Sequence, residues 1–448
     1  MNTQPNSKRE TQNPGEGVTA VSVGGYKSLA EERSIEIRPL TILAGANSSG
    51  KSSIMQPLLL LKQTLEATYD PGALLLDGPN VRFTSVDQLL SKERKVERVA
   101  AFRVGIEVDL GKTVTIRFSK QRAGGLEIAH LTYADERESV SLHAEMTHDE
   151  IAAAVSPNLK GFYETIAQRE GVPPRWVVVR NRCFLDLALR IEDKKESRLV
   201  AYSPGNVIEP HIRNLIHLPG LRGNPERTYP RTAIGPTFSG TFEKYTASII
   251  AGWQAQDNRD AIKGLSQDLE RLGLTWQVVA EPVNDTQVEL RVGRLSRASR
   301  NTVGDLVSIA DVGFGVSQTL PVLVALHAAK PDQLVYLEQP ELHLHPRAQS
   351  ALAQVLADAA NRGVRVVAET HSALLILAVQ SLVAEGYIAP DKVKLHWFKR
   401  RDDGITEITS ADLDEAGAYG DWPEDFAEVA LETESRYLNA AEQRQGQE

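Results

Sequence analysis

Apolar and polar positions alternate in short segments near the N-terminus, at residues 18–23 and 34–37, and a continuous apolar run follows at residues 40–44. Alternation with a period of two is typical of strands, so we expect two short antiparallel strands ahead of a buried one. The next segment, residues 51–68, contains Leu58-Leu59-Leu60-Leu61, a run that makes a helix apolar on all sides. This pattern predicts a helix buried on most faces, which Pro57 should kink because a backbone donor is lost there.

In the middle of the chain, the period of the hydrophobic pattern changes several times. Between residues 96 and 145, short alternating runs are separated by Gly, Asp and Lys turns, which indicates an antiparallel meander. The elements expected in this half are strands at 101–108, 114–118, 126–133 and 140–144, a helical stretch at 147–170, strands within 175–200, helices at 241–256 and 258–272, and a hairpin turning at 284–285.

From residue 303 onward, buried strands alternate with helices. The segment Gly313-Phe-Gly-Val-Ser317 is a glycine-rich turn that opens an apolar helix, and residues 334–338 and 364–368 read as buried strands. Pro346 stands where a helix should begin, because proline is favoured at the first helical position. A hairpin within residues 392–409 closes this part of the chain.

Composition limits the class of protein. A chain of 448 residues is longer than one ordinary core, so two or three structural units are expected. The net charge of −9 argues against a generally basic surface that coats nucleic acid, but it does not exclude a local basic patch. The single cysteine, Cys183, excludes an internal disulfide and fits a small packed residue. No apolar run reaches 18 residues, and the first 17 residues are polar, so we expect a cytoplasmic protein without a membrane segment.

The junction between the strand at 40–44 and the helix at 51–68 carries the strongest motif. Gly45-x-x-x-x-Gly50-Lys51-Ser52 matches the phosphate-binding P-loop at every fixed position. The glycines let the backbone turn so that its N–H groups encircle a phosphate. Lys51 is expected to reach the β- and γ-phosphates, and the Ser52 hydroxyl to hold Mg²⁺. We therefore predict a nucleotide-phosphate site.

An acid ends the first buried strand of the C-terminal half. Glu338 follows an apolar run downstream of the P-loop, as in a Walker B segment, whose acid holds Mg²⁺ beside the P-loop Ser or Thr. The sequence thus predicts a magnesium site made by Ser52 and Glu338. The strand at 364–368 then runs into Glu369-Thr370-His371-Ser372.

The order of these motifs resembles the ABC-type ATPases of the SMC/RecF/OLD group. Tyr26-Lys27-Ser28 is similar to the adenine-side segment, Gly313-Phe-Gly315-Val-Ser317-Gln318 to the ABC signature, Leu337-Glu338-Gln339-Pro340-Glu341-Leu-His343-Leu-His345-Pro346 to the Walker B and D-loop, and Thr370-His371-Ser372 to the switch histidine. The resemblance covers roughly residues 18–90 and 303–410. Within the group, the chain looks most like AAA-type ATPase subunits of bacterial anti-phage systems such as Septu.

This resemblance implies two heads that enclose two ATP molecules, with Gly315 and Ser317 of one subunit facing the γ-phosphate held by the other. Such an arrangement is physically sensible, because helix N-termini attract anions. ATP would then hold the dimer together and hydrolysis would release it. The expected nucleotide contacts are Gly45, Asn47, Ser48, Gly50, Lys51, Ser52, Ser53, Lys27, Gly315 and Ser317, with ATP and Mg²⁺ as cofactors and with Lys51, Glu338, Gln339, Glu369 and His371 as the catalytic set.

One position departs from the family pattern. The family usually has a second acid after the Walker B acid, which orients or deprotonates the attacking water, and Gln339 stands there in this chain. An amide positions water but accepts no proton. We therefore predict slow hydrolysis and a long-lived ATP-bound dimer. Glu341 or Glu369 could replace the acid, and Glu369 is preferred because strand ends at the carboxyl edge of a parallel sheet converge on the ligand.

Two further groups of residues invite other interpretations. His343 and His345 suggest zinc, but no cysteine accompanies them and a D-loop lining the subunit boundary explains them better. Arg222 and Arg227 lie in a loop rich in Pro and Gly. They are equally consistent with an anion or partner contact and with solvated loop charges.

The fold expected is α/β, a P-loop NTPase head of the ABC type with a mixed sheet, an antiparallel β subdomain and a large α+β insertion. The expected divisions are a disordered arm (1–17), an N-terminal lobe with Walker A (18–95), the insertion (96–300), a C-terminal lobe (301–410) and an extension (411–448) that ends in a disordered tail. Only 77 residues follow His371, too few for the nuclease domain of complete OLD proteins.

The function expected is a slow ATPase acting as the sensing or regulatory subunit of an anti-phage complex. Its partners would be a second copy or more of this chain and a separate nuclease or effector, with nucleic acid contacted through the complex. The first alternative is a DNA-repair head that clamps DNA directly, for which the insertion would have to supply a basic groove. The second is a small-molecule kinase, against which the signature and switch histidine count.

Overall fold

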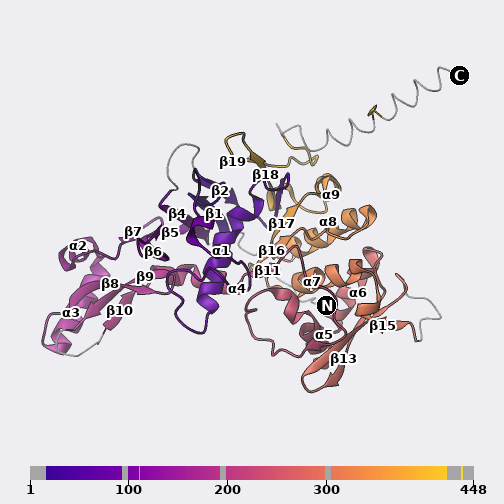
Figure 1. Cartoon of the computed structure of the whole chain (residues 1–448), viewed down its shortest axis with the longest axis horizontal. Helices are drawn as coiled ribbons and strands as arrows, with labels where there is room; N and C mark the ends of the chain where they lie inside the picture. The colour runs from indigo at the N-terminus through magenta and orange to yellow at the C-terminus, as the bar shows by residue number, and fades with distance from the viewer. Residues whose placement is uncertain are drawn as a thin grey trace, which may run out of the picture.

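The computed structural model describes residues 17–92, 99–109, 111–191, 198–297, 304–420 and 435–436 (Figure 1). Nearly all of the disordered arm and tail expected from the sequence therefore lies outside the described residues. At the centre is a six-stranded sheet in the order β11-β16-β17-β3-β18-β19, in which every neighbouring pair is parallel except β18 and β19. Its strands are β11 (Ile216–Leu218), β16 (Leu334–Glu338), β17 (Arg365–Thr370), β3 (Leu40–Gly45), β18 (Val393–Arg400) and β19 (Thr406–Ala411).

The central strands are apolar over most of their length because both faces of the sheet are covered. In β3 and β17 every residue is buried. The strand order places β17 between β3 and β16, although it comes last of the three in the chain. The register sets Glu369 beside both Leu43 and Glu338. The carboxyl ends of three strands that are distant in sequence thus meet at one edge.

One face of this sheet is covered by α1 (Lys51–Glu66), and a second six-stranded sheet lies beyond the helix. Thirteen of the sixteen residues of α1 are buried, which confirms the helix predicted to be covered on most sides. The second sheet is antiparallel and contains the predicted meander, in the order β2 (Arg33–Glu36), β1 (Val18–Gly24), β4 (Ala101–Val108), β5 (Lys112–Lys120), β6 (Leu126–Ala134) and β7 (Ser139–Leu142).

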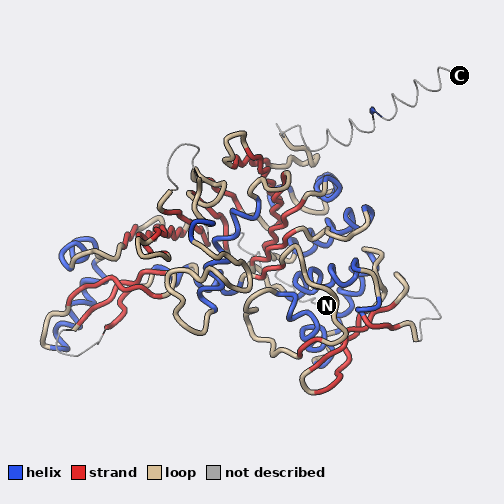
Figure 2. The backbone as a smooth tube through the Cα atoms, viewed as in Figure 1, coloured by secondary structure: helices blue, strands red, loops and turns tan. Residues whose placement is uncertain are grey.

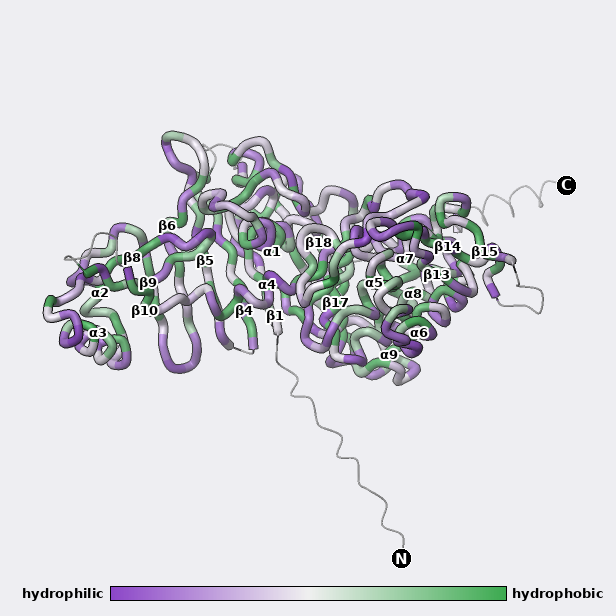
Figure 3. The backbone as a smooth tube through the Cα atoms, turned by 90° about the horizontal axis from the view of Figure 1, so that it is seen from below, coloured by the Kyte–Doolittle hydropathy of each residue, from purple (hydrophilic) through white to green (hydrophobic). Residues whose placement is uncertain are grey.

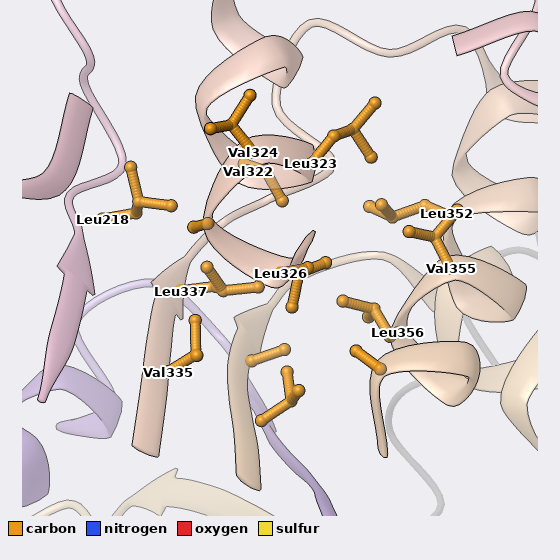
Figure 4. Close-up of a cluster of buried hydrophobic side chains, with 14 of the residues drawn as sticks. Leu218, Val322, Leu323, Val324, Leu326, Val335, Leu337, Leu352, Val355 and Leu356 are labelled. Atoms are coloured by element: carbon orange, nitrogen blue, oxygen red, sulfur yellow. The ribbon is translucent and has the colours of Figure 1, made fainter. Parts of the chain in front are cut away.

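The other face of the central sheet carries a helical layer. Side chains of β11 and β16 pack there against the helices at Phe314–Ala328 and Pro346–Asn361, in the cluster that includes Leu218, Leu337, Leu326 and Leu356 (Figure 4). The helices of this half are α5 (Thr246–Ala255), α6 (Arg259–Arg271), α7 (Phe314–Ala328), α8 (Pro346–Asn361) and α9 (Ala373–Ala384), and the short α4 (Glu209–Asn214) packs on α1.

Two smaller units flank these layers, and Figures 1 and 2 show them on opposite sides of the molecule. The first packs α2 (His148–Ala154) and α3 (Pro157–Glu170) on β8 (Arg175–Asn181), β9 (Phe184–Arg190) and β10 (Arg198–Tyr202). The second is the sheet of β12 (Tyr229–Pro230), β13 (Val278–Asn284), β14 (Gln287–Gly293) and β15 (Leu306–Ser308). Seen from below, β4 to β10 and α5 to α9 again occupy opposite halves (Figure 3).

The structure is an α/β fold with a P-loop NTPase core, as predicted, but two details differ from the expectations. The helical stretch at 147–170 is two helices, because Ser156 precedes Pro157 and a residue before proline avoids the helical region. The expected boundary at 95/96 falls between strands of one sheet, since β1 pairs with β4, and β11 joins the central sheet from within the expected insertion. Hydrogen bonding between strands, and not sequence order, defines these units.

His396 on β18 connects the two six-stranded sheets. Its Nε2 lies 2.8 Å from the carbonyl oxygen of Glu36 and its Nδ1 lies 2.7 Å from Ser410 Oγ. Burial lowers the pKa of His396 to about 4, while the nearby charges of Lys394, Glu36 and Arg38 act in opposite directions. The imidazole is therefore neutral in the folded protein at neutral pH.

We expect this histidine to make stability fall as the pH drops. An unfolded chain takes up the proton near pH 6.5 and the folded one only near pH 4. The contribution is thus fully present above pH 6.5 and lost between pH 6.5 and 4, by about 3 kcal/mol. Urea unfolding at several pH values checks this, with His396→Gln as the variant that does not titrate. Parallel curves for parent and variant across this interval would contradict it.

Candidate functional site

A cavity of about 950 Å³ lies at the carboxyl edge of the central sheet, next to the loop between β3 and α1. Residues from the N-terminal and the C-terminal parts of the chain line it. Residues of the P-loop, the end of β17, the turn after β16 and the β18–β19 hairpin all contribute, and the lining residues are Lys27, Ser28, Asn47, Ser48, Ser49, Gly50, Lys51, Ser52, Ser53, Gln56, Ser85, Asp87, Gln88, Leu90, Lys92, Gln339, Glu369, His371, Arg400, Asp403 and Gly404.

The two motif glycines are required by the shape of this loop. Gly45 has φ +143° and Gly50 has φ +102°, a region that side chains rarely adopt. A Cβ at Gly45 would lie 2.2 Å from the carbonyl oxygen of Phe398, and one at Gly50 would lie 2.4 Å from Thr406 Oγ1. Thr406 also donates to the carbonyl oxygen of Ser49 at 2.7 Å. The β18–β19 hairpin thus fixes the P-loop from behind.

Lys51 is buried and held at the base of the cavity. Its Nζ donates to the carbonyl oxygens of Gly45, at 3.0 Å, and Ala46, at 2.8 Å. Burial lowers the pKa of Lys51, and the charges of Glu369 and Glu341 counteract this. The first turn of α1 has no side-chain cap. Its backbone donors and this ammonium group therefore present a site suited to phosphate.

Ser52 contacts Glu369 directly. Ser52 Oγ donates to Glu369 Oε1 at 2.7 Å, and the Tyr336 hydroxyl donates to Glu369 Oε2 at 2.5 Å. Burial raises the pKa of Glu369, the charge of Glu338 adds to this, and the two hydrogen bonds oppose it. A buried carboxylate with a raised pKa therefore stands beside the hydroxyl expected to hold Mg²⁺.

Glu338 is turned toward β11. Its Oε1 lies 3.1 Å from His217 Nε2, and its Oε2 accepts from the Gly220 backbone N–H at 3.2 Å. Burial raises the pKa of Glu338, but the hydrogen bonds and charge of His217 and the Gly220 N–H hold it below its usual range. Among the described residues that line the cavity, Glu338 is absent. The expected pair of Ser52 and Glu338 is therefore not in direct contact, because β17 lies between their strands.

The remaining members of the expected catalytic set are Gln339 and His371. Gln339 and His371 line the cavity. Glu341 lies behind them and accepts from Thr370 Oγ1 at 2.6 Å and from the His371 N–H at 3.0 Å. Burial and the charge of Lys51 lower the pKa of His371. A neutral imidazole at this place can accept or donate a hydrogen bond to a phosphate or to water.

The structure groups the expected nucleotide contacts into two sets. Asn47, Ser48, Ser53 and Lys27 line the cavity together with the P-loop residues already described. Gly315 and Ser317 are at the start of α7, outside the set of described residues that lines this cavity. The neighbouring Phe314 is 52% exposed, and its ring lies 6.0 Å from that of His343.

Neither interpretation of the two loop arginines fits Arg222. It is buried and donates to three backbone carbonyls, those of Gln318 at 3.0 Å, Glu338 at 2.8 Å and Gln339 at 3.3 Å. It thus fixes the turn after β16. Arg227 is exposed and forms an ion pair with Asp311. The sequence places Arg222 in a polar loop and contains no local signal of this burial.

The donors present fit a nucleotide with Mg²⁺. Among the described residues, no three His, Cys, Asp or Glu side chains are grouped so as to hold a metal alone. Mg²⁺ usually binds one or two protein oxygens together with phosphate oxygens and water. Ser52 Oγ, with Glu369 beside it, provides such oxygens next to an uncapped helix start. His345 caps α8 by accepting from the Arg347 N–H at 3.3 Å, and the His343 ring lies 6.0 Å from that of Phe314.

Sequence reasoning missed several residues that shape the site. His217, whose ring stacks on Tyr336 with centroids 5.5 Å apart, connects Glu338 to Glu369 through the tyrosine hydroxyl. Thr406 and Arg400 reach the P-loop from the far end of the chain, at Ser49 and Ser48. No spacing in the sequence announces these residues, because their partners are more than 100 positions away.

Comparison with known proteins gives one family and a set of distant folds. Residues 174–378 match the family described as "AAA domain, putative AbiEii toxin, Type IV TA system". No curated protein shows significant similarity to the chain. Within the described residues, the helices all fall short of the length and apolar character needed to cross a membrane.

Similar solved structures include an Smc head bound to the C-terminal winged-helix domain of ScpA, with a TM-score of 0.47, 14% identity and coverage of 89% of this chain and 99% of that one. An SMC head domain from Thermotoga maritima has a TM-score of 0.40 and 11% identity, with coverage of 88% of this chain and 98% of that one. A Pyrococcus furiosus Smc head with an extended coiled coil, bound to the C-terminal domain of ScpA, has a TM-score of 0.44 and 12% identity, with coverage of 95% of this chain and 99% of that one. The AAA-domain match, which contains Glu338 and His371, and the P-loop cavity together support an ATPase.

Proposed function

We propose that this chain binds ATP with Mg²⁺ and hydrolyses it slowly. The observation that carries the proposal is the contact between Ser52 and Glu369 in a cavity that also holds the Lys51 ammonium group. Magnesium, when bound there, would neutralise charge on the β- and γ-phosphates. The glycine-rich turn and the first turn of α1 would hold those phosphates through backbone donors.

The side chains that line the cavity would orient and deprotonate the attacking water. Gln339 lines the cavity and can orient a water molecule, but an amide does not take its proton. Glu369 lines the cavity beside Ser52, and we assign it as the carboxylate that accepts that proton. Because Glu369 already accepts from Ser52 and Tyr336, it is a weakened base, which fits slow turnover.

We expect ATP to hold two copies of the chain together. Gly315 and Ser317 lie outside the P-loop cavity, and Phe314 and His343 beside them form an exposed pair. Leu374 and Leu377, 40% and 58% exposed, lie in the first turns of the helix that follows His371. Exposed apolar side chains at such points favour an interface with a partner.

Light scattering with ATP and Mg²⁺ tests this dimer. The mass should double with ATP and return to that of one chain as ATP is consumed, and ADP should leave it unchanged. Release of inorganic phosphate without a phosphorylated acceptor separates an ATPase from a kinase. A mass that is the same with ATP and with ADP would contradict the dimer while leaving ATP binding intact.

We further propose that this ATPase is the sensing or regulatory subunit of an anti-phage assembly in the cytoplasm, with the effector on another chain. Two points support this: the motif order resembles the ATPases of such systems, and the matched family is described as a putative toxin of a toxin–antitoxin system. Co-purification of the tagged chain with the product of a neighbouring nuclease gene is the direct test. Recovery of the chain alone, with no loss of phage resistance on its deletion, would contradict this role.

One observation favours the second candidate, a head that binds DNA itself. On the outer face of the meander sheet, Arg103 lies opposite Arg117, and Arg117 lies opposite His130. Arg103 forms an ion pair with Glu32 at 2.8 Å, and burial lowers the pKa of His130, so Arg117 is the side chain of this row that we expect to contact a phosphate. With His143, these side chains line a cavity of about 520 Å³ that has no carboxylate among its described lining residues.

Duplex DNA binding by the purified chain tests this candidate. Affinity should fall steeply as salt rises from 50 to 200 mM, and Arg117→Ser should weaken it on any sequence, because phosphate contacts carry no sequence information. Lys160→Ser, an exposed change on α3, serves as the control. If the affinity did not depend on the salt concentration, or if both substitutions weakened binding equally, direct DNA binding by this chain would be contradicted.

A further inference from the structure

Two buried rings, those of His217 and Tyr336, contact the acids at the carboxyl edge of the central sheet. His217 on β11 is the register partner of Tyr336 on β16, and the ring centroids lie 5.5 Å apart with an angle of 11° between the planes. His217 is 1% exposed and Tyr336 is completely buried. Because closely packed interior side chains keep fixed rotamers, this stacked pair is a rigid support for the groups that it bonds.

Each ring bonds to a different acid. His217 Nε2 lies 3.1 Å from Glu338 Oε1, and the Tyr336 hydroxyl donates to Glu369 Oε2 at 2.5 Å. Glu338 and Glu369 are register partners on adjacent parallel strands, and carboxylates at such neighbouring positions repel each other when both are ionised. The strand order therefore brings two like charges together, and the two rings bind them at different points.

The direction of the Glu338 side chain follows from its partners. An ionised carboxylate only accepts hydrogen bonds, so His217 Nε2 carries a proton and donates it to Glu338. Glu338 Oε2 accepts from the Gly220 N–H at 3.2 Å, which is in the loop after β11. Both oxygens are thus held on the side of β11. Glu338 is not among the described residues that line the nucleotide cavity, whereas Glu369 lines it and contacts Ser52.

Asn80 connects this histidine to the helix of the P-loop. His217 Nδ1 lies 3.1 Å from Asn80 Oδ1, and a side-chain amide can present either its oxygen or its nitrogen to that ring atom. The Asn80 backbone N–H donates to Gln63 Oε1 at 3.3 Å, and Gln63 belongs to α1. The imidazole is therefore held through both of its nitrogens, on one side by the end of β16 and on the other by a loop that is bonded to α1.

We propose that His217 is a positioning residue of the ATPase site, which holds the Glu338 carboxylate on the side of β11 and leaves Glu369 alone beside Ser52. This inference rests on the proposed function and deepens it. Without a donor at position 217, Glu338 can turn toward Ser52, where its charge opposes that of Glu369. Replacing a residue that orients a metal-site side chain typically changes metal affinity or activity by about 10–100-fold.

Two substitutions of His217 separate its hydrogen bond from its stacking. His217→Phe keeps a ring against Tyr336 but has no donor, and it should lower ATP turnover at least about 10-fold. His217→Gln keeps an N–H donor for Glu338 and should stay within about threefold of the parent. The control is His327→Phe, the same change at a histidine whose Nε2 lies 2.8 Å from Asp268 Oδ2 on α6, and it should leave turnover unaltered.

A double-mutant cycle distinguishes positioning from a general loss of structure. If His217 acts through Glu338, His217→Phe should change turnover less than about twofold in the Glu338→Gln background. Equal factors in the two backgrounds would overturn the proposal, and so would parental turnover of a folded His217→Phe protein. If thermal unfolding shows that His217→Phe is not folded, Asn80→Ala takes its place in the same cycle, and the same two outcomes decide.

The affinity for a fluorescent ATP analogue, measured over a range of Mg²⁺ concentrations, is a second readout that needs no turnover. His217→Phe should shift the Mg²⁺ concentration for half-maximal binding at least about fivefold, and His217→Gln and His327→Phe should not. Equal curves for His217→Phe and the parent would overturn the positioning role. A parent that binds the analogue but hydrolyses no ATP would overturn the proposed turnover, while this titration would still decide the role of His217. A parent that neither binds nor hydrolyses would overturn both.

Discussion

Replacement of Lys51 by alanine is expected to weaken ATP binding by about 100-fold or more. In the structure its Nζ is buried and donates to the carbonyl oxygens of Gly45 and Ala46, close to the phosphate-binding turn. Each charge-assisted hydrogen bond to a phosphate oxygen contributes roughly 1.5–3 kcal/mol, and two of them correspond to a factor of about 100 or more. Titration with a fluorescent ATP analogue measures this loss.

The control for that experiment is Lys263→Ala, which removes an exposed ammonium group on α6. It should bind the analogue as the parent does. The alanine at position 51 also removes the partner of two carbonyl oxygens, so thermal unfolding must show that the variant is folded at the assay temperature. A folded Lys51→Ala protein with parental affinity would exclude the P-loop as the nucleotide site.

Glu369→Gln should lower ATP turnover by about 100-fold to 1,000-fold and change ATP affinity by only a few-fold. The substitution keeps the size of the side chain and a carbonyl oxygen for Ser52 or Tyr336, but it removes the group that takes a proton. Turnover by phosphate release and affinity by titration are measured on the same preparation. Glu369→Ala or Glu369→Gln at parental turnover would exclude Glu369 as the replacement for the acid missing at Gln339.

Glu338→Gln is the informative comparison, because it decides which carboxylate stands nearer to the metal. The direct contact of Ser52 with Glu369 favours Glu369, so the Mg²⁺ concentration for half-maximal turnover should rise more in Glu369→Gln than in Glu338→Gln. If this Mg²⁺ concentration rose more in Glu338→Gln, the result would favour the magnesium site of Ser52 and Glu338 expected from the motif order. Glu338 would then reach the metal through a water molecule, because β17 lies between the two strands.

Most elements followed from local pattern. The strand at 334–338, the helix that begins at Pro346 and the hairpin around residues 284–285 are where periodicity and turn residues placed them. A period of two or of 3.6 is a property of neighbouring residues, so a short window contains it. The P-loop belongs to this class too, because its glycines, lysine and serine act within one turn.

The neighbours of each strand did not follow from local pattern. Any of the apolar strands β3, β11, β16, β17 and β18 suits a position covered on both faces, and nothing in their sequences fixes the order. The order places β17 next to β3, and for that reason Ser52 meets Glu369 and not Glu338. It also places β11 beside β16, which brings His217 to Glu338. The burial of Arg222 under the turn after β16 has the same origin.

The amino-acid sequence by itself therefore determined the α/β class, the phosphate-binding turn and the set of polar residues from which a nucleotide site can be built, since each depends on contacts within a few positions. Only the tertiary structure decided which carboxylate lies beside Ser52, which histidine and arginine support the strand ends, and that a cavity of about 460 Å³ lies beside the first turns of α7. These depend on strand order and on burial, which arise from packing between segments that are far apart in the sequence.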